Sequence, residues 1–497
     1  MIIKINSGFT TKLGILTILL INFTLNQLRA QERYGITLSN FGGINTATIN
    51  PSFTVNSKTF LDVNFLTAGL TIENNFVFYH KNDFKFSELL RANPNLPTNE
   101  VRGEGLDYSL KYQNLTGLAY VEALGPSFSL NIGKHAGGLF TRTVAASSFV
   151  NVPQDLGVLL FEGIRYKPLY GKEISGQKIN VDALGWSEIG LNYSYNYLSG
   201  YYNNWSVGIN IKQLLGYSGA YLSADDLKLN VVNRDTVDIT NILANIGYSL
   251  PINYGSNGYS RTKPLFLGKG IGLDFGFTFR RNLDFAPMGR VTRYCESYFQ
   301  PYRYKLGVAV SGLGNIHFNK NTREHTFENR SALWENIDTT EFRNINDFFE
   351  NLSSVFYGDP HSLPTEEDNM IVGLPTVLNL NADYQYFPNW YLSGMLVLPV
   401  KSSDYQLMFP KKALLGIRYE TDDLEFNFSS SFFNFQKLHI GFFVRYKYFS
   451  IGTSKLESLV KATNLYGINL YFSIKFHLIK GYCLSLPPKH DCGRFQF

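Results

Sequence analysis

The stretch "YGINLYFSIKFHLI", residues 466–479, alternates apolar and polar residues with a period of two. One set of alternate positions holds Tyr466, Ile468, Leu470, Phe472, Ile474, Phe476 and Leu478, and the positions between them include Gly467, Asn469, Ser473, Lys475 and His477. Such a period predicts a β-strand with one apolar and one polar face. A soluble sheet turns its apolar face inward, whereas a membrane barrel turns it outward to lipid. The direction of this face therefore decides the fold.

The first thirty residues have the organisation of a signal peptide. Lys4 and Lys12 precede the apolar run Leu13–Leu25, and Ala30 supplies a small residue at a cleavage position. The run is shorter than the ~20 residues that span a bilayer. A buried N-terminal helix is the alternative interpretation. No cysteine follows Ala30, which disfavours a lipoprotein anchor, and we expect the chain to be exported.

Composition narrows the class of protein further. The 497 residues include 15% aromatics and only 17% charged residues, against about 25% charged in typical globular domains. Loss of residues 1–30 removes Lys4, Lys12 and Arg29 and lowers the net charge from +5 to +2. This charge, without a basic patch, predicts no nucleic-acid partner. No later apolar run is long enough for a membrane helix, which leaves a secreted β-protein or an outer-membrane barrel.

The same alternation recurs along the chain. It is clear in 187–197, 205–212, 271–280, 302–311, 376–386, 411–420, 423–429 and 437–444, and weaker near 58–80, 116–149 and 238–250. We predict an all-β fold, a transmembrane antiparallel barrel of about 14 strands whose apolar faces contact lipid. The polar faces then line the lumen, with candidates Asp274, Arg280, Arg303, Lys305, Asp383, Arg418, Glu420, Glu425, His439, Lys475 and His477. The alternative is that these charges form the solvent face of a secreted sandwich.

Connection lengths predict an orientation, because outer-membrane barrels keep periplasmic turns short and extracellular loops long. If the last strand descends to a periplasmic C-terminus, the alternation of strand directions places three tight connections in the periplasm, near 445–447, 421–422 and 388–389. It places two longer stretches outside the cell, 401–410 and 319–371. The connection 283–301 is an exception to this rule, because it is long and yet the alternation of strand directions places it in the periplasm.

Two connecting segments carry helical signals. The sequence "FRNINDFFENLSSVFYG" sets Phe342, Ile345, Phe349, Leu352 and Phe356 on one stripe. This stripe fits a lid over the barrel mouth, or a loop helix that packs on the rim. The stretch "PQDLGVLLFEGI", 153–164, has a similar apolar character.

Three cysteines remain, and the predicted orientation places all of them in the oxidising periplasm. Cys483 and Cys492 flank "LSLPPKHD", whose two prolines could turn the chain back, so a Cys483–Cys492 disulfide is expected. Zinc held with His490 is the alternative, but a structural zinc site needs four ligands and this stretch supplies three. Cys295 is left over.

Catalytic motifs are absent from the sequence. It contains no G-x-S-x-G elbow, no phosphate-binding glycine loop and no H-E-x-x-H. His439 and His477 lie on polar strand faces, where a lumen-lining histidine is a better interpretation than a general base. We therefore expect no enzyme, no cofactor and no metal.

The segment 31–57 precedes the first strand and differs from it. It is rich in Gly and Asn, and Gly42, Gly43 and the turn at Asn50 and Pro51 predict a compact non-strand element. Its Asn, Ser and Thr side chains suit hydrogen bonding to a polar lumen. We predict that 31–57 enters the barrel as a plug and limits passage.

These residues also carry a family resemblance. The stretch "INPSF" resembles the "NPA" entry of outer-membrane barrels related to FadL and PorV, with Ser52 where that pattern has Ala. The succession "GLDFGFTFR", "YRYKLGVAVSGLGNIHF" and "FSIGTSKLESLV" is similar to an uncharacterised family of barrels from Bacteroidota. The resemblance implies an outer-membrane barrel with an N-terminal lumen segment. It implies no catalytic residue and no particular cargo.

The expected organisation is a signal peptide (1–30), a plug (31–57), a barrel (58–480) and a periplasmic tail (481–497). The leading functional hypothesis is passage or binding of small molecules, hydrophobic ones among them, through a partly plugged lumen. The alternative is a structural or docking component of a secretion or surface-assembly system. The expected partners are outer-membrane lipid and either a small apolar ligand or a protein of such a system. Charged lumen residues and a movable plug favour transport, whereas a sealed lumen and apolar outer loops favour docking.

Overall fold

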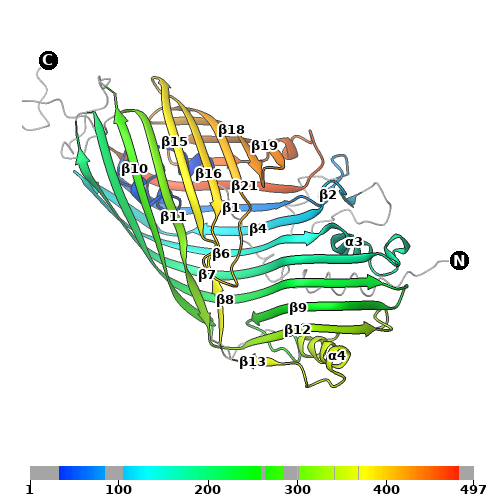
Figure 1. Cartoon of the computed structure of the whole chain (residues 1–497). Helices are drawn as coiled ribbons and strands as arrows, with labels where there is room; N and C mark the ends of the chain where they lie inside the picture. Colours follow the sequence, from blue (N-terminus) through cyan, green and yellow to red (C-terminus); the bar gives the residue numbers. More distant parts are fainter. Residues whose placement is uncertain are drawn as a thin grey trace, which may run out of the picture.

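The computed structural model describes residues 33–83, 105–200, 202–258, 264–283, 299, 301–340, 342–367 and 369–480. Strands dominate it, and its helices are short (Figure 1). The predicted signal peptide, the tail 481–497 and all three cysteines lie outside the described residues. In the part of the chain that is described, no helix combines the length and the hydropathy needed to cross a membrane.

The strands form a closed antiparallel barrel. In spatial order its 14 positions are β1 Thr59–Asn74, β4 Asn114–Leu124 with β5 Ser127–Ile132, β6 His135–Pro153, β7 Glu173–Ser199, β8 Asn203–Val231, β10 Gly268–Asn282, β11 Tyr302–Phe318, β14 Met370–Gly373 with β15 Val377–Phe387, β16 Trp390–Pro399, β17 Lys412–Glu420, β18 Leu424–Phe433, β19 Lys437–Tyr446, β20 Phe449–Thr453 and β21 Gly467–Ile479. The last strand, β21, pairs with β1 and closes the ring. The prediction of a barrel of about 14 strands is confirmed.

Strand β21 shows which way the apolar face of the sheet points. Its polar residues Ser473, Lys475 and His477 are buried, whereas Ile474 and Phe476 are exposed on the outside. The same holds around the ring, where the outer face exposes Phe65, Ile189, Leu191, Val207, Ile211, Ile271, Phe275, Leu306, Val308, Leu392, Leu415, Ile417, Phe428, Ile440 and Ile451. A continuous apolar outer surface around a polar interior is what contact with lipid requires.

The first wall strand begins and the last one ends at the same end of the barrel, because Thr59 pairs with Ile479. The tight turns after β15, β17 and β19 lie at this same end. Exposed aromatic side chains gather at this end of the barrel, including Tyr197, Tyr202, Tyr386, Phe387, Trp390, Tyr446 and Tyr448. Aromatic rings of this kind mark the membrane–water boundary of barrels.

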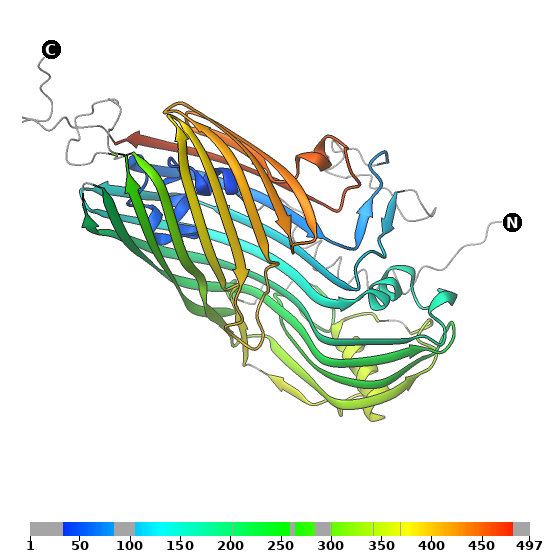
Figure 2. The ribbon, with the colours of Figure 1, turned by 45° about the horizontal axis from the view of Figure 1, so that its top comes forward.

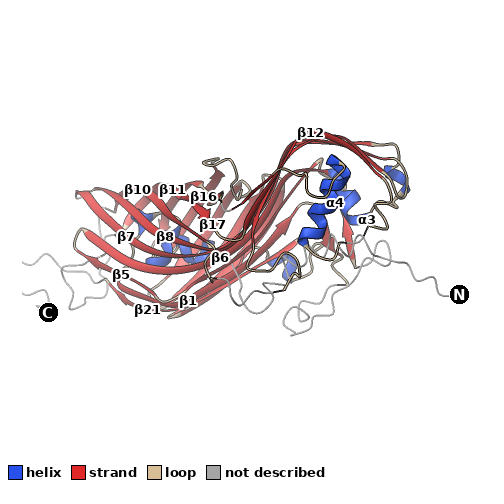
Figure 3. Cartoon of the chain, turned by 90° about the horizontal axis from the view of Figure 1, so that it is seen from below, coloured by secondary structure: helices blue, strands red, loops and turns tan. Residues whose placement is uncertain are grey.

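At the opposite end, part of the sheet continues beyond the barrel. β7 and β8 have 27 and 29 residues, whereas about 9–11 residues span a membrane. Their far halves join β9 Val237–Ser249, β12 Thr322–Trp334 and β13 Thr365–Glu367 in one curved sheet. We call this sheet, with helices α3 Gln154–Glu162 and α4 Ile345–Tyr357, the extension (Figures 1 and 3).

The extension corrects two expectations. The predicted strand 238–250 belongs to β9, which pairs with β8 and β12 outside the ring. The segment 319–371, expected to be an outer loop with one helix, contains strands β12 and β13 as well. Alternation predicts a strand and its faces but not its neighbours, so it could not separate wall strands from the strands of the extension.

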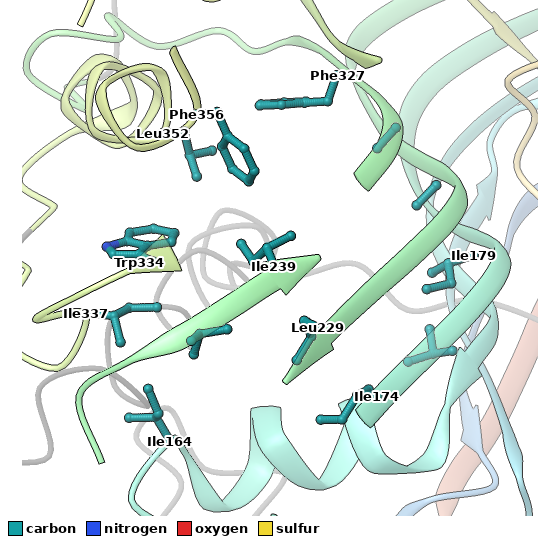
Figure 4. Close-up of a cluster of buried hydrophobic side chains, with 14 of the residues drawn as sticks. Ile164, Ile174, Ile179, Leu229, Ile239, Phe327, Trp334, Ile337, Leu352 and Phe356 are labelled. Atoms are coloured by element: carbon teal, nitrogen blue, oxygen red, sulfur yellow. The ribbon is translucent and has the colours of Figure 1, made fainter. Parts of the chain in front are cut away.

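The concave side of the extension has its own apolar core (Figure 4). Helix α4 buries the predicted stripe of Ile345, Phe349, Leu352 and Phe356 against it. Sheet and loop residues close the other sides, among them Ile174, Ile179, Leu229, Ile239, Phe327, Trp334 and Ile337. Of the two interpretations of this helix, packing at the rim agrees with the structure.

A charge on the outer face should disrupt the barrel selectively. Replacing Phe275, which is 46% exposed on the outside, with arginine should destabilise the inserted protein by about 2–4 kcal/mol near the bilayer midplane. Leu470→Arg should act in the same direction. Gel mobility of the folded barrel after refolding into lipid vesicles at increasing urea concentrations measures this loss.

The matched control is Gln177→Arg, an exposed position on the extension part of β7. It lies beyond the lipid band and should leave the urea midpoint unchanged. Gly276→Arg is unsuitable as a control, because a Cβ there would lie 2.1 Å from the Asn50 Oδ1 atom of the plug. Equal sensitivity at Gln177 and Phe275 would contradict the lipid-facing assignment.

Candidate functional site in the barrel lumen

Residues 33–57 occupy the lumen between the wall strands (Figure 2, dark blue). They form α2 Tyr34–Leu38, η1 Gly43–Thr48 and η2 Pro51–Phe53, and all of them are buried except Thr48 and Ile49, which are half-buried. The barrel with an N-terminal lumen segment is thus confirmed. Short helices and turns suit this segment because its Asn, Ser and Thr side chains bond backbone groups locally.

The turn at Asn50 and Pro51 packs closely against glycines of the barrel wall. The Asn50 side chain accepts hydrogen bonds from the amide and hydroxyl of Ser52, at 3.0 and 2.7 Å, and so caps η2. Gly208 and Gly276 are register partners on β8 and β10. A Cβ on Gly208 would lie 2.4 Å from the Pro51 carbonyl carbon. Only glycine allows the plug to approach the wall this closely.

Of the two predicted plug glycines, Gly43 lies against β1 and Gly42 packs within the plug. Gly43 has a φ of +55°, and a Cβ there would lie 2.1 Å from the carboxyl carbon of Asp62. The next residue, Ile44, donates its amide to Asp62 at 3.2 Å. Gly42 has a right-handed conformation and caps η1. Gly43 therefore allows the plug backbone to reach a wall carboxylate.

Five neighbouring strands carry alternating charges on the inner wall. Glu122, Arg142, Glu188, Lys212 and Asp274 lie on β4, β6, β7, β8 and β10. Arg142 lies 2.7 Å from Glu188 and 3.8 Å from Glu122, and Lys212 lies 2.7 Å from Asp274. At the start of the plug, Arg33 forms a buried ion pair with Glu122.

The opposite side of the lumen carries a second series. Lys305, Asp383, Arg418, Glu425 and Arg445 lie on β11, β15, β17, β18 and β19. The successive closest nitrogen–oxygen distances are 3.8, 2.8, 3.9 and 3.0 Å. Arg418 is fully buried and also lies 3.1 Å from Glu420. Buried charges require such partners because isolated ones are costly.

The plug contacts these wall charges mainly with neutral groups. Ser39 donates to Glu425 at 2.7 Å. Asn40 donates to Glu420 through its amide nitrogen and its side chain, at 3.2 and 3.1 Å. Lys58, the residue that follows the plug, lies 2.7 Å from Glu420. Together with Arg33, it places one cation at each end of the plug.

Most of the predicted lumen candidates are buried. They are Asp274, Arg280, Lys305, Asp383, Arg418, Glu420, Glu425, His439, Lys475 and His477, none more than 8% exposed. Lys475 lies 2.8 Å from Asp62 and also donates to the Phe41 carbonyl of the plug. His477 lies beside the Phe41 ring, with 5.6 Å between centroids.

Arg303 is placed differently. It is exposed, and its guanidinium lies 5.1 Å from the centroid of Tyr384. The pairing of β10 with β11 shifts between Arg281 and Asn282, which oppose Tyr304 and Tyr302. This β-bulge turns Tyr302 inward, where it bonds Asp383 at 2.5 Å, and leaves Arg303 outside. A single extra residue reverses the faces of a strand, and alternation alone does not reveal it.

His439 lies in a third charged cluster, near the extension end of the lumen. Its ring nitrogens lie 2.8 Å from Glu73 and 2.6 Å from Glu457. Lys412 and Lys455 lie 3.2 and 3.1 Å from Glu73. β1 and β17 are not neighbours in the ring, so the contact between Glu73 and Lys412 ties opposite walls together.

Sequence reasoning missed several charged residues of the lumen. They are Asp62, Glu73, Glu122, Arg142, Glu188, Lys212 and Arg445. Most belong to predicted strands, and Glu122 and Arg142 lie in the weak run 116–149. The only sequence signal for them was a place on the polar face of an alternating strand, as for the candidates that were predicted. Their partners, up to 413 residues away in the case of Asp62 and Lys475, have no signal in one sequence.

A second obstruction lies nearer the extension. Residues 400–411, the mouth loop, turn inward, so that Leu407 is fully buried and Phe409 packs edge-on against Tyr120 at 5.2 Å. They meet an apolar cluster of Leu118, Val144, Leu184, Trp186, Leu214, Ile316, Phe318, Met370 and Val372. The lumen is therefore polar beside the plug and apolar beneath the mouth loop.

This arrangement suits binding and obstruction. Within residues 33–83, 105–200, 202–258 and the other described stretches, no cluster of His, Cys, Asp and Glu has the composition of a metal site. Each charged residue of the three clusters described above faces an opposite charge. The lumen therefore holds the plug against a largely charge-paired wall.

A family model described as "Family of unknown function (DUF5723)" matches residues 51–454. No curated protein matches the chain. Among solved structures, a Pseudomonas aeruginosa FadL homologue is 11% identical, with 87% of this chain and 94% of that chain covered and a TM-score of 0.35.

Two further structures illustrate the range of similarity. The P. putida toluene transporter TodX is 10% identical, with 88% and 94% covered and a TM-score of 0.31. The translocator domain of autotransporter NalP from Neisseria meningitidis is 7% identical, with 84% and 89% covered and a TM-score of 0.30. Similarity at this level assigns no activity to this chain.

Removing the charge of Arg418 should destabilise the barrel strongly. Arg418→Met leaves Asp383, Glu420 and Glu425 without their shared cation, and breaking a buried ion pair costs about 3–5 kcal/mol. The urea midpoint in lipid vesicles, followed by tryptophan fluorescence, measures this loss. Adding Asp383→Asn should restore part of it, because one unpaired carboxylate is then neutral.

The matched control is Arg234→Met. The Arg234 side chain is 78% exposed, with Asp235 its ion-pair partner, and its loss should change stability by no more than about 0.5 kcal/mol. Equal effects at both arginines would show that the lumen ion pairs do not hold the barrel together.

Proposed function

This chain belongs to the family of unknown function DUF5723, and we propose that it is an outer-membrane barrel that binds or passes small molecules, hydrophobic ones among them. In this proposal the plug closes the lumen at rest. The barrel end where β1 begins and β21 ends faces the periplasm, with 481–497 as a periplasmic tail, and the extension faces the outside of the cell. The signal-like residues 1–30, the apolar outer band and the aromatic girdle support this location.

The observation that carries the proposal is the way the plug is attached. Contacts such as those of Ser52 with Thr278 and Thr54 with Ser194 join neutral hydroxyls. Each such hydrogen bond contributes only about 0.5–1.5 kcal/mol net, because water can replace it. The wall carboxylates that bind plug cations keep a second partner, with Arg142 beside Glu122 and Arg418 beside Glu420. The plug can therefore move without leaving a buried wall carboxylate unpaired.

The apolar region beneath the mouth loop supports the hydrophobic part of the proposal. Leu407 and Phe409 are held there by apolar contacts with inward-facing wall residues. A small apolar molecule could replace those contacts at little cost, since the hydrophobic effect is non-directional. A charged solute would be disfavoured in the same place.

A docking role is the second candidate, and the filled lumen favours it. The described lumen is obstructed both by the plug and by the mouth loop. The extension also projects a folded surface beyond the barrel. Under this hypothesis, plug position would not affect solute flux.

A disulfide lock on the plug separates the two functions. Ser52 and Thr278 have side-chain oxygens 2.5 Å apart, one on the plug and one on β10. In a background with Cys295, Cys483 and Cys492 replaced by serine, Ser52→Cys with Thr278→Cys should reduce conductance in planar bilayers when oxidised. Reduction should restore it, and deletion of 33–57 should raise conductance severalfold.

The control pair is Thr67→Cys with Ser473→Cys. These oxygens are 2.7 Å apart and join two wall strands, β1 and β21, without touching the plug. Oxidation of this pair should leave conductance unchanged. If the deleted protein is assembled and conducts no more than the intact one, the plug does not gate passage and the docking role is the better account.

A further inference from the structure

An open pocket lies where the extension leaves the barrel wall. It has a volume of about 660 Å³. β11, β12 and β14 form one side, and the start of the mouth loop forms the other. Its lining is Asn315, Glu324, Asn369, Ile371, Lys401, Ser402, Ser403, Asp404 and Tyr405. The proposed passage does not use this pocket.

The loop side of the pocket is rigidly held. The Gln406 side chain, which is buried, accepts hydrogen bonds from the amides of Ser402 and Ser403 at 2.7 and 3.3 Å. It donates to the carbonyls of Leu374 and Val400 at 3.0 and 3.1 Å. The backbone that carries the pocket side chains is therefore organised before any ligand binds.

One aromatic ring and one carboxyl group are fixed in the same way. Tyr405 stacks on Tyr221, with centroids 3.9 Å apart and an interplanar angle of 10°. The Tyr221 hydroxyl donates to Glu324 at 2.5 Å. Burial and nearby Glu366 raise the pKa of Glu324, against the opposing effect of the Tyr221 hydrogen bond. The Tyr221 hydrogen bond thereby fixes the position of the Glu324 carboxyl group at the pocket wall.

The chemistry of the lining excludes several ligand classes. A hydrocarbon would meet apolar surface mainly at Ile371 and Tyr405. A phosphate would meet the carboxyl groups of Glu324 and Asp404 against the single cation of Lys401. What remains is a neutral ligand with many hydroxyls, which amides, carboxyls and an ammonium can bind together.

We propose that this pocket binds a saccharide. The Tyr405 ring offers an apolar plane for the C–H face of a sugar, as aromatic rings with a polar edge do at binding surfaces. Asn315, Asn369 and Asp404 supply donors and acceptors for its hydroxyls. At this end of the barrel the sugar would come from a free oligosaccharide or from the head of a glycolipid in the outer leaflet.

The test uses the full-length protein in lipid nanodiscs. The probes are glucose, galactose, N-acetylglucosamine and the core oligosaccharide of lipopolysaccharide, with toluene and inorganic phosphate as counter-probes. Saturation-transfer NMR and titration calorimetry should detect at least one of the saccharides. Asp404→Ala and Tyr405→Ala should each weaken its binding about tenfold, which corresponds to about 1.4 kcal/mol.

Two variants control for structural effects. Tyr405→Phe keeps the ring and should retain most of the affinity. Glu173→Ala removes an exposed carboxylate at the far end of β7, outside the pocket lining, and should leave binding unchanged. Because the readout is binding, the result holds whether or not the plug gates passage.

The outcomes are distinct. Binding of the free core oligosaccharide supports the proposal and a soluble source. If the added saccharide fails to bind only in nanodiscs that contain lipopolysaccharide, the head of the glycolipid already occupies the pocket. This outcome supports the proposal and assigns the membrane source. The proposal is overturned if no saccharide binds, if Asp404→Ala and Tyr405→Ala leave saccharide binding unchanged, or if toluene or phosphate binds in a way that these variants abolish.

Discussion

The pairing of buried charges across neighbouring strands is the constraint on which the rest of this structure depends. A wall in contact with lipid must turn its polar positions inward, and a plug then removes those positions from water. Arg418 is fully buried and is tolerable only because Asp383 and Glu420 lie at 2.8 and 3.1 Å. A slip of one residue in register would separate these groups and expose them to lipid. The ion pairs thus specify the register.

The same constraint explains why the plug is polar but nearly neutral. Most wall charges already have a wall partner of opposite sign, so further plug charges would lack partners. Neutral Asn, Ser and Thr side chains fill the remaining donor and acceptor positions of the wall. The two cations at the ends of the plug, Arg33 and Lys58, meet carboxylates that already have wall partners. The segment can therefore fill the lumen without depending on it for charge balance.

Much of the barrel could be predicted from alternation, because lipid forces a period of two on every wall strand. The outward face of Phe275 and the inward face of Lys475 follow directly from it. Alternation has no information on partners, so β9 could not be distinguished from a wall strand, although the total of about 14 was right. Arg303 was misplaced because a bulge reverses the faces locally. The inward turn of Leu407 could not be predicted, because a loop has no alternation of apolar and polar residues that would show which side is buried.

The two obstructions of the lumen are physically different, and this has a consequence for how the barrel could open. The mouth loop is held inward by the burial of Leu407 and Phe409 among apolar side chains. An apolar guest can compete for those contacts, but it offers nothing to the hydrogen bonds of Ser52 or Asn40. The plug is held by groups that water or another polar partner can replace. Entry from outside and release to the periplasm would therefore respond to different stimuli, and a bound apolar molecule alone would not open the barrel from end to end.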